Sequence, residues 1–262
     1  MTLYRSEFGV TVMENILVPM RDGVRLATDV YFPVEQSGKT SEWPLPVILE
    51  RTPYNKRSPD RIEKNCRYFA ERGYIFVMQD CRACYQSEGD FGFFWQEGPD
   101  GFDTMAWITE QDWCNGSIGT TGTSYAGWTQ NSLAALDPPG LKCMWVNEGA
   151  SNGYTSTLRH GGALELRFLT WLYWHAAMND NAGLKDTEAA VKSLAKADTR
   201  EILKQLPIKR GQTALAHAPA YEELAIKLLT SGDYNELWKD SSVNFQLHWD
   251  QFADVPTVFS SA

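Results

Sequence analysis

Hydrophobic and polar positions along the first part of the chain follow the periods of alternating strands and helices. Residues 24–31 follow a polar Arg-Asp-Gly turn and alternate apolar with polar side chains, which predicts a half-buried antiparallel strand in a hairpin. Residues 46–50 and 74–79 are short continuous apolar runs, typical of strands buried on both faces. A helical pattern over residues 61–72 lies between them and stops at Gly73, a residue suited to a helix C-cap.

The same alternation continues toward residue 150. Residues 100–111 carry a helical pattern for which Asp100 is a plausible N-cap. A strand is predicted over residues 116–121, a helix over 128–136 and a further strand over 141–146. An antiparallel entry followed by β-α-β-α-β alternation predicts an α/β fold, with a mostly parallel sheet flanked by helices.

The pattern changes after Gly149. Residues 163–239 show helical periodicity, interrupted by glycine and proline, and no strand pattern, so we expect a helical insertion. Strand character returns at residues 255–260. The predicted organisation is therefore a first part of the sheet domain over residues 1–150, a helical insertion over 151–245 and a return strand within 246–262.

Composition narrows the class of protein. The 262 residues include 43% hydrophobic and 22% charged side chains, which predicts a packed core. A net charge of −9 argues against a nucleic-acid or anionic-membrane partner, because both require clustered basic charge. No apolar run approaches the roughly 20 residues of a membrane span, and the N-terminus lacks an export signal. We therefore expect a cytoplasmic enzyme.

The cysteines suggest no metal or redox centre. Five cysteines cannot all pair, which suits a reducing compartment. Cys81 and Cys84 form a C-x-x-C pattern, but no second C-x-x-C or C-x-x-H provides the remaining ligands of a zinc site. Packing is the preferred interpretation, and we predict neither a metal nor a cofactor.

The residues from Gly122 to Gly127 form the most informative motif. A predicted strand precedes this stretch and a predicted helix follows it, which is the context in which a G-x-S pattern indicates a serine nucleophile on a sharp turn. Ser124 is then the candidate nucleophile. The common motif has glycine two residues after the serine, whereas Ala126 stands there and Gly127 follows. An ordinary Gly/Ser turn is the alternative interpretation.

A serine nucleophile needs a base and an acid, and neither is evident in the pattern. His175 and His217 lie inside predicted helices, and His248 and Asp254 precede the last strand, at the wrong end of the sheet. His160 follows a strand after the nucleophile and is the least unfavourable of the four histidines. Packing, capping or surface roles are the preferred interpretation of each.

Several ordered motifs give the chain a resemblance to a known family. They are VPMRDGVRLATDVY at 18–31, RTPY at 51–54, QDCR at 79–82 with SEG at 87–89, WCNG at 113–116, and the serine motif G-x-S-Y-x-G. Together they resemble the X-Pro dipeptidyl-peptidase (S15) and CocE/NonD group of serine hydrolases, which includes cocaine esterase and related acylases. In that family the displaced glycine, here Gly127, is part of the serine motif. Ala83 departs from the glycine usual after the family's Asp-x-Arg.

The resemblance implies an α/β-hydrolase fold and a role for each matching residue. Ser124 would attack the acyl carbon, the backbone N–H of Tyr125 would be one oxyanion donor, and the hydroxyl of Tyr54 the other. The helical insertion would form a cap whose aromatic residues line the substrate pocket; the weak candidates are Trp171, Tyr173 and Trp174. The implied substrate is a small ester or amide, or a short peptide, with no cofactor.

Members of the family carry their acid directly after the strand matched by residues 255–260, and their histidine further on. Neither is present here, so we expect the N-terminal portion of a longer hydrolase that is truncated before its last strands and a C-terminal β-sandwich. Ester and Xaa-Pro peptide hydrolysis are not distinguished by these motifs. The alternatives are a non-catalytic fragment or binding module that retains the fold, and a Ser124–His160 dyad.

Overall fold

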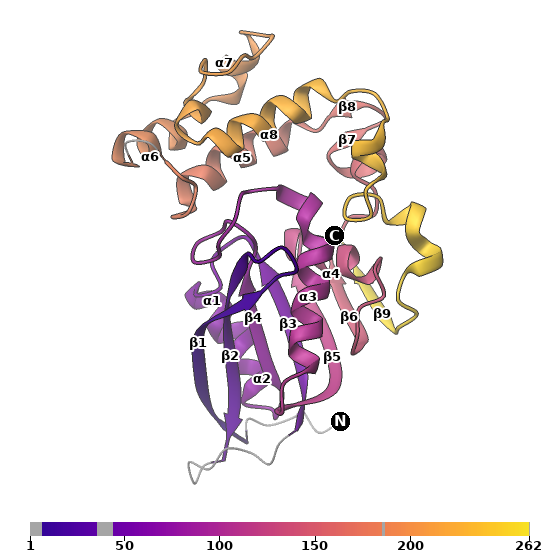
Figure 1. Cartoon of the computed structure of the whole chain (residues 1–262). Helices are drawn as coiled ribbons and strands as arrows, with labels where there is room; N and C mark the ends of the chain where they lie inside the picture. Colours follow the sequence, from indigo (N-terminus) through magenta and orange to yellow (C-terminus); the bar gives the residue numbers. More distant parts are fainter. Residues whose placement is uncertain (1–6, 36–43, 185–186, 262) are drawn as a thin grey trace.

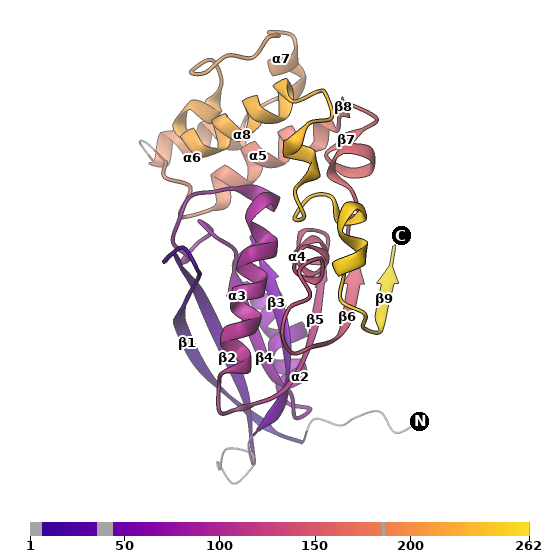
Figure 2. The ribbon, with the colours of Figure 1, turned by 45° about the vertical axis from the view of Figure 1, so that its right-hand side comes forward.

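A twisted sheet, with helices on both faces and a helical region over one end, organises the protein (Figures 1 and 2). The structure, a computed structural model, describes residues 7–35, 44–184 and 187–261. Within these residues the main sheet has the strand order β1-β2-β4-β3-β5-β6-β9. The strands are β1 (Gly9–Pro19), β2 (Arg25–Val34), β3 (Leu45–Thr52), β4 (Ile75–Asp80), β5 (Cys114–Thr123), β6 (Leu141–Asn147) and β9 (Thr257–Ser260).

The pairing confirms an antiparallel entry into a parallel sheet. Strand β2 pairs antiparallel with β1 and β4, whereas β4, β3, β5, β6 and β9 run parallel. The helices are α1 (Pro59–Arg61), α2 (Tyr68–Ala70), α3 (Glu97–Thr109), α4 (Tyr125–Ala134), α5 (Leu166–Met178), α6 (Thr187–Ala195), α7 (Thr199–Leu203) and α8 (Pro219–Thr230). A π-helical segment, Ile62–Arg67, joins α1 to α2. This is the α/β-hydrolase fold predicted from the sequence.

Strand β4 explains why the central strands read as continuous apolar runs. Its side chains alternate between two cores: Ile75 and Val77 pack with residues of α3 and α4, whereas Phe76 and Met78 pack with Cys66 and its neighbours between α1 and α2. Both faces are therefore covered, and every residue of the strand is buried. The α/β arrangement follows directly from this pattern.

Two local predictions are wrong. Strand β2 is buried along nearly its whole length rather than half-buried, because it lies inside the sheet between β1 and β4. Helix α3 begins at Glu97, so Asp100 is not its N-cap. A 3-10 turn over Phe93–Gln96 leads directly into the helix, and the Asp100 carboxylate is held instead by the guanidinium of Arg82 at 2.6 Å.

Helices α5 to α8 lie over the carboxyl ends of the parallel strands (Figures 1 and 2). Their core includes Leu172, Tyr221 and Trp238, all buried. A two-residue ladder joins β7 (Arg159–His160) to β8 (Ala163–Leu164), so the expectation of no strand from residue 163 onward is wrong at its first two residues. The turn between these strands, Gly161-Gly162, has positive φ at both residues, which glycine adopts without strain. No helix of the described residues is long and apolar enough to cross a membrane.

Candidate active site

The turn between β5 and α4 places Ser124 at a sharp reversal of the backbone. Ser124 has φ 60° and ψ −114°, a conformation that non-glycine residues rarely adopt and that costs of order 1–3 kcal/mol. Its backbone N–H donates to the carbonyl of Asn147 at the end of β6, and its carbonyl accepts from the N–H groups of Gly127 and Trp128, each at 2.9 Å. The side chain makes no capping hydrogen bond to α4 and is exposed.

Two glycines allow this turn for different steric reasons. A Cβ at Gly122, where φ is +143°, would lie 2.6 Å from the Cβ of Ala126, so a side chain there is excluded. A Cβ at Gly127 would lie 2.8 Å from the carbonyl oxygen of Asn147 and 3.0 Å from the Cα of Gly149. Gly127 therefore allows α4 to pack against the chain that leaves β6, which is the physical reason for a glycine three residues after the serine.

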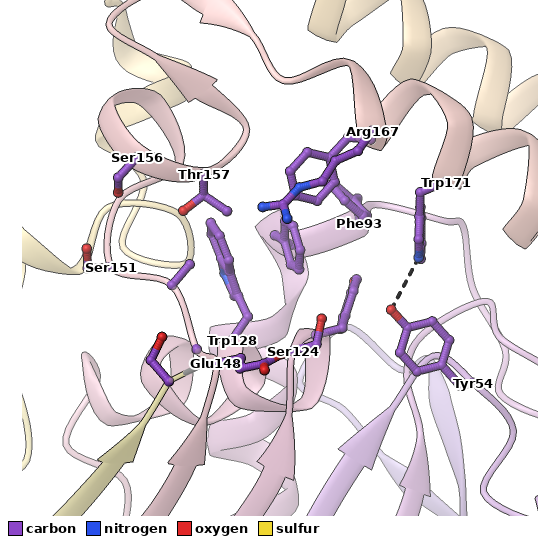
Figure 3. Close-up of a pocket in the computed structure, with 16 residues that line it drawn as sticks. Tyr54, Phe93, Ser124, Trp128, Glu148, Ser151, Ser156, Thr157, Arg167 and Trp171 are labelled. Atoms are coloured by element: carbon purple, nitrogen blue, oxygen red, sulfur yellow. Dashed lines mark hydrogen bonds between the residues drawn. The ribbon is translucent and has the colours of Figure 1, made fainter. Parts of the chain in front are cut away.

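Ser124 opens onto a cavity of about 580 Å³ between the sheet and α5 (Figure 3). Tyr54, Tyr125 and Trp171 of the predicted site residues also line it. Tyr173 does not: it is buried in the core of the helical region. Trp174 is about half exposed and lies outside the lining, although its ring packs 5.9 Å from that of Tyr54.

Helix α5 fixes the position of Tyr54 through two side chains. The indole Nε1–H of Trp171 donates to the Tyr54 hydroxyl oxygen at 3.2 Å (Figure 3). His175 stacks on Trp171, with ring centroids 4.4 Å apart, and its Nε2 lies 2.8 Å from the carbonyl oxygen of Pro53. Since the Trp171 N–H occupies an acceptor position of the Tyr54 oxygen, the phenolic proton is available to another acceptor in the cavity.

His175 is neutral in this arrangement. Burial lowers the pKa of its imidazole to about 4. The carbonyl of Pro53 accepts only, so Nε2 carries the proton, and Nδ1 accepts from the hydroxyl of Tyr221 at 2.8 Å. Both ring nitrogens are thus committed to structure. His175 orients the loop of Tyr54 and has no nitrogen free to accept a proton from Ser124.

A buried charged network adjoins the elbow, by which we mean the turn from Gly122 to Gly127 that carries Ser124. The Tyr125 hydroxyl donates to Glu97 at 2.9 Å, and Glu97 pairs with Arg51 at 2.9 Å. Arg51 also lies 3.9 Å from Asp100, whose carboxylate binds Arg82. Burial raises the pKa of Glu97 despite the opposing effect of Arg51. The network holds the ring of Tyr125 and, through it, the first residue of α4.

None of the four histidines, all of which lie in the described part of the chain, lines the cavity. His160 Nε2 lies 3.3 Å from Glu165, and His248 Nε2 contacts the carbonyl oxygen of Lys239 at 3.2 Å. His217 belongs to a 3-10 turn in the helical region. The structure does not bring His160 to Ser124, so the proposed dyad is wrong.

The C-x-x-C pattern has the environment of packed thiols. Cys81 and Cys84 are buried, and burial raises the pKa of both well above the usual value. Such thiols stay protonated near neutral pH and are poor nucleophiles and ligands. The described residues contain no group of three or more histidine, cysteine and acidic side chains placed to hold a metal ion.

Several cavity residues were not identified from the sequence. Phe93, Phe94, Trp128 and Phe168 supply aromatic walls, and two charged side chains, Glu148 and Arg167, also line the space. The aromatic residues come from the loop before α3, from α4 and from α5, which are far apart in sequence. Glu148 follows β6 at φ 51° and offered only its place after a predicted strand as a signal.

Comparisons with known proteins identify relatives of this chain. Residues 22–261 match the profile of the family described as X-Pro dipeptidyl-peptidase (S15 family). Cocaine esterase of Rhodococcus sp. (strain MB1 Bresler) is 32% identical over 242 residues, which are 89% of this chain and 41% of that protein. The 42% identity to an Xaa-Pro dipeptidyl-peptidase of Lactobacillus helveticus covers 53 residues, 20% of this chain and 7% of that protein.

Two solved structures share the fold over the whole chain. An aminopeptidase from a marine sediment Thaumarchaeota archaeon aligns with a TM-score of 0.68 at 21% identity, and an alpha-amino acid ester hydrolase with 0.65 at 22%. Each match covers 100% of this chain and 44% of the other, so the chain spans less than half the length of these relatives. The profile match over residues 22–261 shows that the chain belongs to the X-Pro dipeptidyl-peptidase (S15) family, a family of acyl hydrolases.

Proposed function

We propose that this chain carries the nucleophile and the oxyanion hole of a serine hydrolase that cleaves an ester or amide through an acyl-enzyme. The observation that carries the proposal is the strained backbone of Ser124, which presents an exposed hydroxyl to a cavity also lined by Tyr54. Family membership supports acyl-transfer chemistry. The proposal includes both peptide and ester substrates, because the residues that line the cavity include no feature unique to either class.

In the proposed reaction, the Oγ of Ser124 bonds to the acyl carbon while its proton passes to a base. The carbonyl oxygen gains negative charge and accepts hydrogen bonds from the Tyr125 N–H, at the N-terminus of α4, and from the Tyr54 hydroxyl. Collapse breaks the bond to the leaving group, which takes up a proton. Water then attacks the acyl carbon of the acyl-enzyme and gives a proton to the base. The bond to Ser124 Oγ breaks, Oγ takes up a proton, and the acid is released.

Among the described residues, no histidine lines the cavity, and Glu148 is the one acidic residue that does. The four histidines of the chain have the other positions described above. The proposal therefore assigns the nucleophile and the oxyanion donors to this chain, and assigns the base to none of the histidines. The same observation favours the second candidate function, a binding module that has the fold and the cavity but no acyl transfer.

Covalent labelling distinguishes the two candidates. The chain is treated with a fluorophosphonate at pH 9, where hydroxide replaces part of the function of a missing base, and adducts are located by peptide mass spectrometry. We expect phosphonylation of Ser124 that is absent in Ser124→Ala and unchanged in Ser156→Ala, a serine of the same cavity. Removing one oxyanion donor with Tyr54→Phe lowers the labelling rate about 100-fold. Equal labelling of wild type and Ser124→Ala would leave the binding module as the function.

A further inference from the structure

The cavity above Ser124 is lined by an arginine, Arg167. Arg167 belongs to the first turn of α5, and its guanidinium points into the cavity (Figure 3). The side chain packs over the ring of Phe168, with the guanidinium carbon 5.1 Å from the ring centroid. No carboxylate of the described residues forms an ion pair with it, in contrast to most arginines of the sheet domain, among them Arg21, Arg51, Arg57 and Arg82.

The acidic residue nearest to Arg167 in sequence is engaged elsewhere. Glu165 is the N-cap of α5, where its carboxylate accepts from the backbone N–H of Arg167 at 3.4 Å. The same carboxylate lies 3.3 Å from the Nε2 of His160. Both contacts hold Glu165 at the end of the helix backbone. Glu165 therefore does not pair with the guanidinium of Arg167, which carries five N–H donors and points into the space in which a substrate would lie (Figure 3).

The groups around the Arg167 guanidinium are suited to bind a planar anion such as a carboxylate. The hydroxyls of Ser156 and Thr157 line the cavity beside Arg167, and the aromatic rings of Phe93, Trp128 and Trp171 line other parts of it (Figure 3). A guanidinium presents a rigid fork that matches a carboxylate, with which it can form two parallel hydrogen bonds. Stacking on Phe168 limits the freedom of the side chain before binding.

Glu148 places a negative charge on the side of the cavity opposite to Arg167. It lies at the carboxyl end of β6, on the sheet side of the cavity, whereas Arg167 lies on the α5 side (Figure 3). The two side chains form no ion pair with one another in the described residues. An anionic group is attracted by Arg167 and repelled by Glu148, so it would be placed on the side of α5, away from the end of β6.

We infer that Arg167 is a specificity residue, and that the substrate of this site is an ester or amide that carries a carboxylate. The inference rests on the proposed function, since it places this carboxylate in a cavity where Ser124 attacks the scissile bond. The carboxylate can belong to the acyl part or to the leaving group. Both sources have the same chemistry at the guanidinium, and the experiment separates them.

The test compares acylation of Ser124 by matched anionic and neutral esters. In the acyl arm, the mono-4-nitrophenyl ester of adipate is paired with 4-nitrophenyl hexanoate, which has the same chain length and a methyl group in place of the carboxylate. In the leaving-group arm, 4-carboxyphenyl acetate is paired with 4-acetylphenyl acetate. The initial burst of the released phenol gives each rate, and the rate ratio of anionic to neutral ester is the readout.

We expect a ratio above that of the uncatalysed reaction in one arm, and that arm identifies the part of the substrate that carries the charge. Arg167→Gln lowers this ratio about tenfold, as expected for the loss of a charge-assisted hydrogen bond. The matched control is Arg200→Gln, which removes an exposed arginine of α7 that does not line the cavity and leaves the ratio unchanged. Glu148→Gln raises the ratio about threefold by removing a repulsion, and added salt lowers the wild-type ratio.

The ester experiment distinguishes an error in the role of Arg167 from an error in the proposed function. If no ester acylates Ser124, the proposed function is wrong. If neutral and anionic esters acylate it with the ratio of the uncatalysed reaction in both arms, Arg167 does not select an anion. A preference that Arg167→Gln leaves intact also overturns the assignment, because the selectivity then comes from another group.

Discussion

The two walls of the cavity hold their functional groups by different means. On the sheet side, Ser124 is fixed by the backbone of the elbow, and the adjacent Tyr125 by a buried network of charges that includes Arg51 and Glu97. On the α5 side, Tyr54 is fixed by neutral hydrogen bonds and stacked rings. The proposed nucleophile thus depends on the fold of the sheet, whereas the proposed second oxyanion donor, Tyr54, depends on how α5 packs over the sheet.

The largest expected effect concerns the charged network of the sheet side. Arg51→Met leaves Glu97 buried without its partner, which lowers the free energy of unfolding by about 3–5 kcal/mol. The matched control is Arg25→Met, which removes a pair with Glu88 whose members are about half exposed and screened by solvent, so the free energy of unfolding falls much less. Urea denaturation measures both. Equal losses in the two variants would show that the buried network does not stabilise the elbow.

The second prediction concerns the neutral histidine of α5. The pKa of His175 is about 4 in the folded protein against an ordinary value of 6.5, so between these limits the unfolded chain binds the proton and the folded chain does not. Stability from this group is present above pH 6.5 and is lost as the pH falls toward 4. From pH 7 to pH 5 the loss amounts to about 2 kcal/mol.

Urea denaturation of His175→Gln at the two pH values tests this sign. The variant lacks the titrating group, so its stability falls less between pH 7 and pH 5 than that of the wild type. Burial raises the pKa of Asp80 to about 6, which gives a contribution of opposite sign in the same range, but both proteins contain Asp80 and it cancels in the difference. Parallel pH curves for wild type and His175→Gln would contradict a buried neutral imidazole.

The same contrast explains what the sequence predicted. The elbow was predicted from local pattern, because a strand, a small-residue turn and a helix are contiguous and Gly122 and Gly127 act on near neighbours. The apolar runs predicted the central strands for the same reason. Tyr54 was assigned only through the family resemblance. No local pattern could identify it, because its hydroxyl contacts Trp171, which is 117 residues away in the sequence.

The remaining site residues depend on tertiary contacts that no local pattern encodes. Asp100 has the features of an N-cap, but its carboxylate is taken by Arg82, 18 residues away. Arg167 is one exposed charge among many in the sequence, and its significance arises from the cavity that α5 covers. Tyr173 and Trp174 follow Trp171 closely in sequence, but they lie on other faces of α5. Tyr173 is buried in the core of the helical region, and Trp174 is exposed outside the cavity lining.

The smallest expected effect concerns the hydrogen bond between Trp171 and Tyr54. Trp171→Phe keeps an aromatic ring but removes the N–H that donates to Tyr54, and we expect the fluorophosphonate labelling rate of Ser124 to fall about threefold, the size of one neutral hydrogen bond. Trp174→Phe is the matched control, because the ring of Trp174 packs near that of Tyr54 without a hydrogen bond to it, and its replacement leaves the rate unchanged. In a Tyr54→Phe background, Trp171→Phe has no further effect if it acts through the Tyr54 hydroxyl. A threefold loss that persists in that background would show that Trp171 acts on the cavity directly, and that the α5 wall does not work by orienting Tyr54.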